Sequence, residues 1–149
     1  MPIRVQTTDF DAGREMATMT RGKKAVGAVA SFIGLVRDVN DRSQVGGMTL
    51  EHYPGMTEKA LDKIVAEAHD RWDIDDALVI HRVGTLEPGD QIVLVVVTSA
   101  HRGEAFQACE FLMDYLKTRA PFWKKERTSQ GDRWVDARSS DDAAADRWT

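Results

Sequence analysis

Cysteine is almost missing from this sequence, which contains one such residue, Cys109, among 149. A single thiol cannot form a disulfide within the chain, and it cannot provide the paired cysteines of a structural zinc site. The histidines are scattered without the short spacing typical of metal ligands: His52, His69, His81 and His101. The sequence therefore predicts no metal site and no bound cofactor.

Long apolar runs are also absent. No stretch approaches the ~18 apolar residues that a membrane-spanning helix needs, and residues 1–11 lack the basic-then-apolar pattern of a signal peptide. We therefore expect a cytoplasmic protein. A length of 149 residues fits one domain, 1–149.

An excess of positive charge is missing too, since the formal net charge is −4. A broad cationic face that could coat nucleic acid is therefore not expected. One segment has the opposite charge balance. Glu126 is its only anion, and its cations are Lys117, Arg119, Lys124, Lys125 and Arg127. Local charge opposite to the global sign favours the capture of a small anionic ligand. On charge alone, a solvated helix end explains this segment equally well.

The N-terminal third of the chain predicts strands around one helix. Residues 3–7 alternate as a short strand, and a helix capped by Thr8 or Asp9 follows and runs to about residue 19. Residues 25–37 are rich in small and β-branched side chains, which predicts a long strand. Residues 38–47 are polar and predict a mobile loop.

From Met48 onward the expected order is strand, helix, strand, strand, helix, strand. The expected elements are strand 48–53, a helix from about 57, strands 77–83 and 92–98, helix 103–117, and strands 122–127 and 133–137. This is the ferredoxin-like β-α-β-β-α-β order, with helices on one face of a mainly antiparallel sheet. The predicted fold class is α+β, with the earlier strands and helix extending the sheet or forming a small β subdomain.

The junction at residues 98–103 is the first candidate site. A strand that is apolar throughout leads there into a helix N-terminus, where free N–H groups and the helix dipole favour an anion. His101 and Arg102 add side-chain donors at this point. An ordinary capped helix with a surface arginine explains the junction equally well.

The second candidate site lies beyond the helix that ends at Lys117. Pro121 prevents the helix from continuing. Strand alternation then places Lys124 and Glu126 on one face, and Lys125 and Arg127 on the other. Lys124 is therefore expected to point at a cleft beside a carboxylate that orients it.

Two further residues have weaker signals. Arg37 ends the long strand at the edge of the polar loop, where it could clamp a phosphate. Cys109 lies within the apolar stripe of its helix, with Phe106 and Met113, and is expected to be an inert packing residue.

Together these segments resemble the large, catalytic subunit of molybdopterin synthase. The similarity extends from about Ala25 to Trp148. Its most specific strings are FIGLVR at 32–37, LEHYPGMTEKAL at 50–61, TSAHR at 98–102, MDYLKTRAPFWKKE at 113–126 and GDRWV at 131–135. The resemblance implies a ferredoxin-like core of the α/β-hammerhead type.

The resemblance also implies an activity and partners. In that family a sulfurtransferase converts cyclic pyranopterin monophosphate into molybdopterin by adding the two dithiolene sulfurs. Sulfur arrives as a thiocarboxylate on the C-terminal Gly-Gly of a small ubiquitin-like subunit. Two large subunits form a central homodimer, with one small subunit at each end of the heterotetramer.

Site roles are carried over from the family residue by residue. Lys117 and Lys124 match its two essential lysines. The substrate-binding positions are matched by Arg37, His101, Arg102, Lys117, Lys124, Lys125 and Glu126. Arg138 matches a basic residue that enters the pocket from the other large subunit, whereas Leu35 stands where relatives often have lysine.

Two other functions remain compatible with the scaffold. One is a non-catalytic module that binds an anion or a pterin phosphate. The other is a nucleic-acid-binding domain, against which the acidic balance and an expected lack of exposed aromatic residues on the sheet both count.

Overall fold

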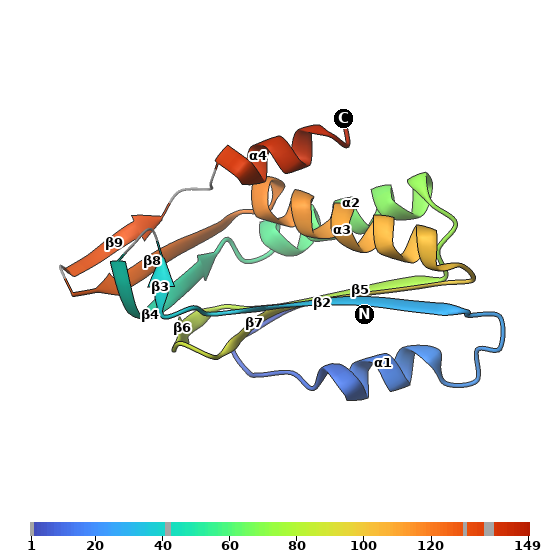
Figure 1. Cartoon of the computed structure of the whole chain (residues 1–149), viewed down its shortest axis with the longest axis horizontal. Helices are drawn as coiled ribbons and strands as arrows, with labels where there is room; N and C mark the ends of the chain where they lie inside the picture. Colours follow the sequence, from blue (N-terminus) through green and yellow to red (C-terminus); the bar gives the residue numbers. More distant parts are fainter. Residues whose placement is uncertain (1, 41–42, 130, 136–138) are drawn as a thin grey trace.

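The computed structural model describes residues 2–40, 43–129, 131–135 and 139–149. Two β-sheets form its framework (Figure 1). The first sheet has the order β1-β5-β7-β2, and its strands are β1 (Ile3–Gln6), β5 (Asp76–Arg82), β7 (Gln91–Ser99) and β2 (Ala28–Leu35). The second has the order β3-β4-β8-β9, with β6 also paired to β4. Its strands are β3 (Val39–Asn40), β4 (Ser43–His52), β8 (Phe122–Thr128), β9 (Gly131–Val135) and β6 (Gly84–Leu86).

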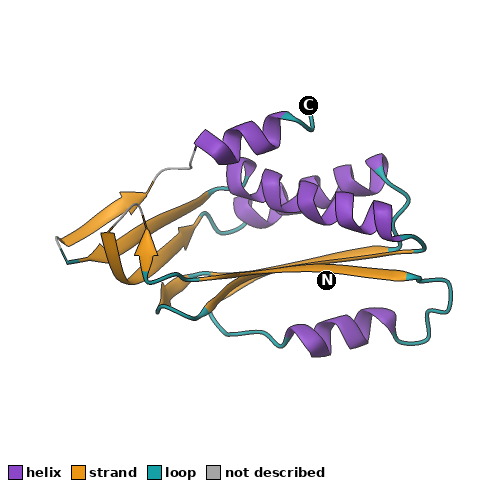
Figure 2. Cartoon of the chain, in the orientation of Figure 1, coloured by secondary structure: helices purple, strands orange, loops and turns teal. Residues whose placement is uncertain are grey.

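Helices cover both faces of the first sheet (Figure 2). They are α1 (Ala12–Thr20), α2 (Met56–Arg71), α3 (Arg102–Arg119) and α4 (Ser139–Asp146). In Figure 1, α1 lies below this sheet, whereas α2 and α3 lie above it and α4 lies over α3. The α+β class is as predicted from the sequence. The earlier strands β1 and β2 extend the first sheet, whereas the small second sheet is built mainly from the later strands β4, β8 and β9.

Strand β7 forms the centre of the core because its side chains are apolar on both faces. Val93, Val95 and Val97 pack in the cluster that includes buried residues of α2 and α3. Leu94 and Val96 alternate with them and pack in a second cluster with residues on and beside α1. Both faces of this strand are thus covered, as its continuous apolar pattern predicted.

The six elements from Met48 onward do not form the single sheet that was expected. β5 pairs antiparallel with β7, and β4 pairs antiparallel with β8. These two pairs lie in different sheets, because β2 and not β4 occupies the second edge of β7. Helices consequently cover two faces of the first sheet and not one.

Several local expectations also need correction. The first helix is capped by Asp11, whose side chain accepts from the Arg14 N–H at 3.1 Å, and not by Thr8 or Asp9. Most of residues 38–47 belong to β3 and β4, so the expected loop is largely strand, while residues 41–42 lie outside the described part.

The C-terminal segment packs on its own chain. Trp148 lies edge-on to Trp72 of the α2 end and to Phe111 of α3, with ring centroids 5.4 and 5.7 Å apart. Its indole N–H donates to Asp114 at 2.7 Å. Trp148 is therefore covered within the chain, by α2 and α3.

Candidate active site

A cavity of about 560 Å³ opens where the two sheets meet. Residues 32–37 form one wall, the last turns of α3 form another, and strands β4 and β8 complete it. Its charged lining consists of three cations and two carboxylates: Arg37, Lys117, Lys124, Glu126 and Asp141. The volume falls within the range of about 300–1,000 Å³ that is usual for small-molecule sites.

The break at Pro121 brings the two lysines into the same cavity. Lys117 lies in the last turn of α3, where the helix dipole favours a cation. The residue before the proline, Ala120, has the extended backbone angles φ −101° and ψ 138° that proline imposes. The chain then turns into β8, and Lys124 faces the cavity that Lys117 lines.

Alternation along β8 follows the sequence prediction. Phe122, Lys124 and Glu126 line the cavity. On the opposite face, the Lys125 ammonium lies 5.5 Å from the centroid of the Trp134 ring. Lys125 was carried over from the family as a substrate-binding residue, but within this chain it lies outside the cavity.

Glu126 is the buried carboxylate of the cavity, with 3% of its surface exposed. The Arg133 guanidinium, on the neighbouring strand β9, donates to its Oε1 at 3.2 Å. A buried carboxylate needs such a charged partner to offset its lost hydration. Sequence reasoning paired Glu126 with Lys124 and missed Arg133, which cross-strand register places opposite it.

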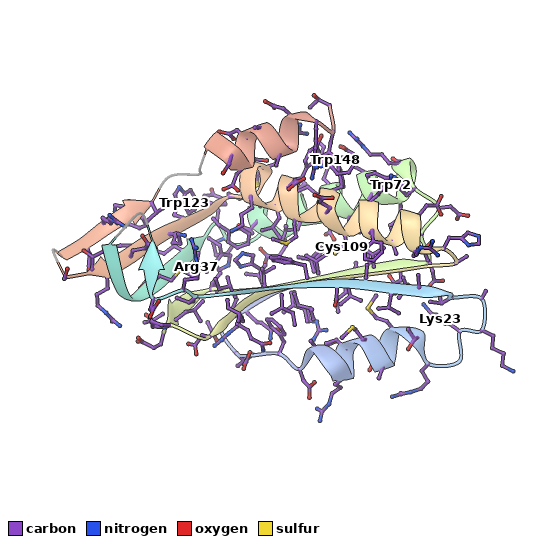
Figure 3. The ribbon with its side chains drawn as sticks, viewed as in Figure 1. Lys23, Arg37, Trp72, Cys109, Trp123 and Trp148 are labelled. Carbon is purple, nitrogen blue, oxygen red and sulfur yellow. The ribbon has the colours of Figure 1, made fainter. Side chains whose placement is uncertain are left out.

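Arg37 lies at the mouth of the cavity, at the end of the first sheet nearest to the second (Figure 3). It follows a bulge between Gly34 and Leu35, where the pairing of β2 with β7 shifts. The bulge ends the strand and turns the following residues towards the cavity. The expected clamp position of Arg37 therefore agrees with the geometry.

His101 and Arg102 lie at the other end of α3. His101 is the N-cap of this helix. Between residues 101 and 117 an α-helix rises by about 24 Å, so the two candidate sites are not brought together within one chain. Arg138, the remaining predicted site residue, lies outside the described residues.

His81 also lines the cavity, although it was not among the predicted site residues. It comes from β5, and its ring stacks on Phe122 with centroids 3.8 Å apart. The pKa of His81 is lowered from 6.5 to about 4, mainly by burial; the hydrogen bond to the Arg82 carbonyl opposes this shift, and the charges of Lys117 and His52 add to it. No sequence signal marked it, because the stack joins residues that are distant in the chain.

Cys109 is buried and reduced, as expected from the apolar stripe of α3, and it points from the helix towards the first sheet (Figure 3). Burial, with a smaller contribution from the nearby Glu110, raises the pKa of its thiol to about 11. The nucleophilic thiolate is thus disfavoured. The expectation that Phe106 shares this buried stripe was wrong, since 64% of its surface is exposed.

The expected lack of exposed aromatic residues on the sheet was also wrong. Trp123 of β8 and Trp134 of β9 are 48% and 58% exposed.

Within the described part of the chain, no group of three or more potential metal ligands occurs, and no helix there is long and apolar enough to cross a membrane.

Comparison with known proteins agrees with this geometry. The family model described as MoaE protein matches residues 5–119. The molybdopterin synthase catalytic subunit of Ralstonia nicotianae is 68% identical over 146 residues, which are 98% of this chain and 83% of that protein.

Solved structures show the same similarity. The molybdopterin biosynthesis MoaE protein from Burkholderia ambifaria is 59% identical with a TM-score of 0.84, over 98% of this chain and 96% of that one. Molybdopterin synthase from Staphylococcus aureus is 29% identical with a TM-score of 0.82, over 91% and 97% of the two chains. The chain therefore belongs to the MoaE family, that of the molybdopterin synthase catalytic subunit.

Proposed function

We propose that this chain, as one catalytic domain of residues 1–149, transfers sulfur to cyclic pyranopterin monophosphate and so forms the dithiolene of molybdopterin. The observation that carries the proposal is the meeting of Lys117, Lys124 and Arg37 around one cavity in a member of this family. We place the reaction in the cytoplasm.

The cavity suits a small organic anion. Its cations attract the phosphate of the precursor, and Arg37 at the mouth can hold it with paired donors. Apolar side chains on the inner walls, among them Met113, Leu116 and Phe122, suit the flat pterin ring. The same positive charge attracts the thiocarboxylate of an incoming tail.

The two lysines take different parts in the reaction. Lys117 is assigned to the thiocarboxylate tail and the reacting carbon, and Lys124 to proton transfer and to the stabilisation of developing charge. The charged groups beside Lys124 in the cavity, including Glu126 with its partner Arg133, fix the local field in which it works.

The sulfur donor is a separate small ubiquitin-like subunit. Cys109 is the only cysteine of the chain, and its buried thiol cannot carry sulfur to the cavity. A Gly-Gly tail carries no side chains and can therefore approach Lys117 in the cavity closely. This chain therefore supplies the pocket and the cations, and its partner supplies the sulfur.

His101 and Arg102 can act at the cavity of a second copy of this chain. Strand β2 is one of the two edge strands of the first sheet, and several of its apolar side chains are exposed: Val29, Phe32, Ile33 and Leu35. An unpaired apolar edge favours pairing with another strand. An isologous dimer about a two-fold axis would place the start of one β2 beside the end of the other.

This pairing explains how distant residues can share one site. The start of β2 lies next to His101, because the Gly27 N–H donates to the Ser99 carbonyl at 3.0 Å. The end of β2 leads to Arg37 at the mouth of the cavity. His101 and Arg102 of one copy thus reach the cavity of the other, and we assign Arg138 to the same shared site.

The test combines the purified chain, the precursor and the thiocarboxylated small subunit, with molybdopterin read as fluorescence after oxidation. The proposal expects product only when all three are present. Tight binding of the precursor without turnover would instead support the non-catalytic pterin-binding module. Product formed without the thiocarboxylated subunit would refute the assignment of the sulfur donor.

A further inference from the structure

We propose that His81 positions the substrate in this cavity: its Nε2 accepts a hydrogen bond from an N–H or O–H group of the bound pterin precursor. The inference rests on the proposed function and adds a residue to its site. It starts from the tautomer of the ring and from the face that the ring presents to the cavity.

The tautomer follows from one contact. Nδ1 of His81 lies 2.8 Å from the backbone carbonyl oxygen of Arg82. A carbonyl can only accept, so Nδ1 carries the hydrogen, and Nε2 of the neutral ring has a free lone pair. Burial keeps the ring neutral by holding the pKa of His81 near 4.

The position of the ring directs this lone pair at the cavity. His81 is 5% exposed and belongs to the cavity wall. Within the described part of the chain no protein group bonds to Nε2, and no fully buried polar side-chain atom lacks a partner. Nε2 therefore reaches the open space of the cavity, near Lys117, whose charge acts on the ring.

The chemistry of the lining gives this acceptor a specific use. Arg37, Lys117 and Lys124 can only donate hydrogen bonds, and they select the anionic part of a ligand. A pterin also carries N–H donors, and the precursor carries hydroxyl groups. A neutral imidazole fixed from behind by the Arg82 carbonyl can pair with such a donor and adds no further positive charge.

Two amide substitutions separate this role from a structural one. In His81→Gln the amide lies where Nε2 was and can accept from the ligand, whereas in His81→Asn it lies where Nδ1 was and can donate only to the Arg82 carbonyl. Each purified variant is titrated with cyclic pyranopterin monophosphate by calorimetry, and its turnover is measured with the thiocarboxylated partner. His81→Phe, which keeps the stack on Phe122 without polar atoms, is the third variant.

We expect His81→Asn and His81→Phe to raise the dissociation constant and KM about tenfold, as the loss of one hydrogen bond does, with kcat little changed. We expect His81→Gln to recover most of the affinity. Recovery by asparagine and not by glutamine, or equal affinity in all variants, would overturn the inference. A wild-type chain without turnover would instead count against the proposed function, so the two failures are distinct.

Discussion

The Thr57 hydroxyl donates to the carbonyl oxygen of Pro121 at 3.2 Å and accepts from the Tyr53 N–H at 3.0 Å. Thr57 is completely buried. This bond ties the start of α2 to the break between the helix that carries Lys117 and the strand that carries Lys124. The relative position of the two lysines therefore depends on a hydroxyl outside the cavity lining.

Replacing Thr57 by valine removes this link at nearly constant volume. We expect Thr57→Val to lower the free energy of unfolding by about 2 kcal/mol, since it leaves two partly buried backbone groups without their partner. Thr57→Ser is the control, because it keeps the hydroxyl and loses one buried methyl group, at about 1 kcal/mol. Urea unfolding measures both, and a serine variant less stable than the valine variant would contradict this reading.

Adjacent lysines on β8 provide a matched pair for the site. We expect Lys124→Ala to fold normally and to reduce sulfur transfer about 100-fold or more, as the loss of a catalytic proton donor does. Lys125→Ala removes the same charge from the opposite face and is expected to leave turnover within about threefold. Steady-state assays with the thiocarboxylated partner decide, and equal losses in both variants would show that only total charge matters.

Stability is expected to fall on mild acidification because of His81. Its pKa is lowered from 6.5 to about 4, so between these values the unfolded chain binds a proton that the folded chain does not. The stability that neutral His81 contributes is therefore fully present above pH 6.5 and is lost as pH falls towards 4. The free energy of unfolding is expected to decrease by about 2 kcal/mol between pH 7 and pH 5. Urea unfolding at both pH values measures it, with His81→Gln as the control whose stability should change less.

The thiol of Cys109 is expected to resist alkylation. With its pKa raised to about 11 and its side chain buried, the native protein should react with iodoacetamide at least about 100-fold more slowly than the same protein in urea. Mass spectrometry of timed samples measures the rate. Rapid modification of the native chain would show an accessible thiolate and reopen the question of the sulfur donor.

If two copies of the chain share each site, as proposed, two inactive variants should recover activity when they are mixed. Lys117→Ala and Arg102→Ala alter residues at opposite ends of α3. A mixed dimer has one cavity with both defects and one that is intact. If subunits mix at random, about one quarter of wild-type activity should return. Activity equal to the mean of the two parents would show that each chain builds its site alone.

Local patterns predicted the features that depend on neighbours in the sequence. Pro121 had to end α3, and alternation had to separate Lys124 from Lys125, because both follow from backbone geometry. The run of valines in β7 likewise indicated a strand covered on both faces. These features could be read before any tertiary contact was known.

Features that depend on competition between distant segments could not be predicted in this way. Whether β2 or β4 pairs along β7 is decided by long-range packing, and so the strands divide into two sheets. The stack of His81 on Phe122 joins residues from different sheets. Alternation along β8 puts Trp123 on the same face as Lys125, yet its exposure depends on what packs over that face.

Residues 32–37 line the cavity from β2 and the turn after it, and β2 is also an edge strand of its sheet. In the proposed dimer, selection therefore acts on a substitution there both through assembly with a second copy and through chemistry. Drift in this segment should be slow even at exposed positions, and loss of assembly should rarely occur without loss of activity. An inhibitor bound at this edge would act on both properties at once.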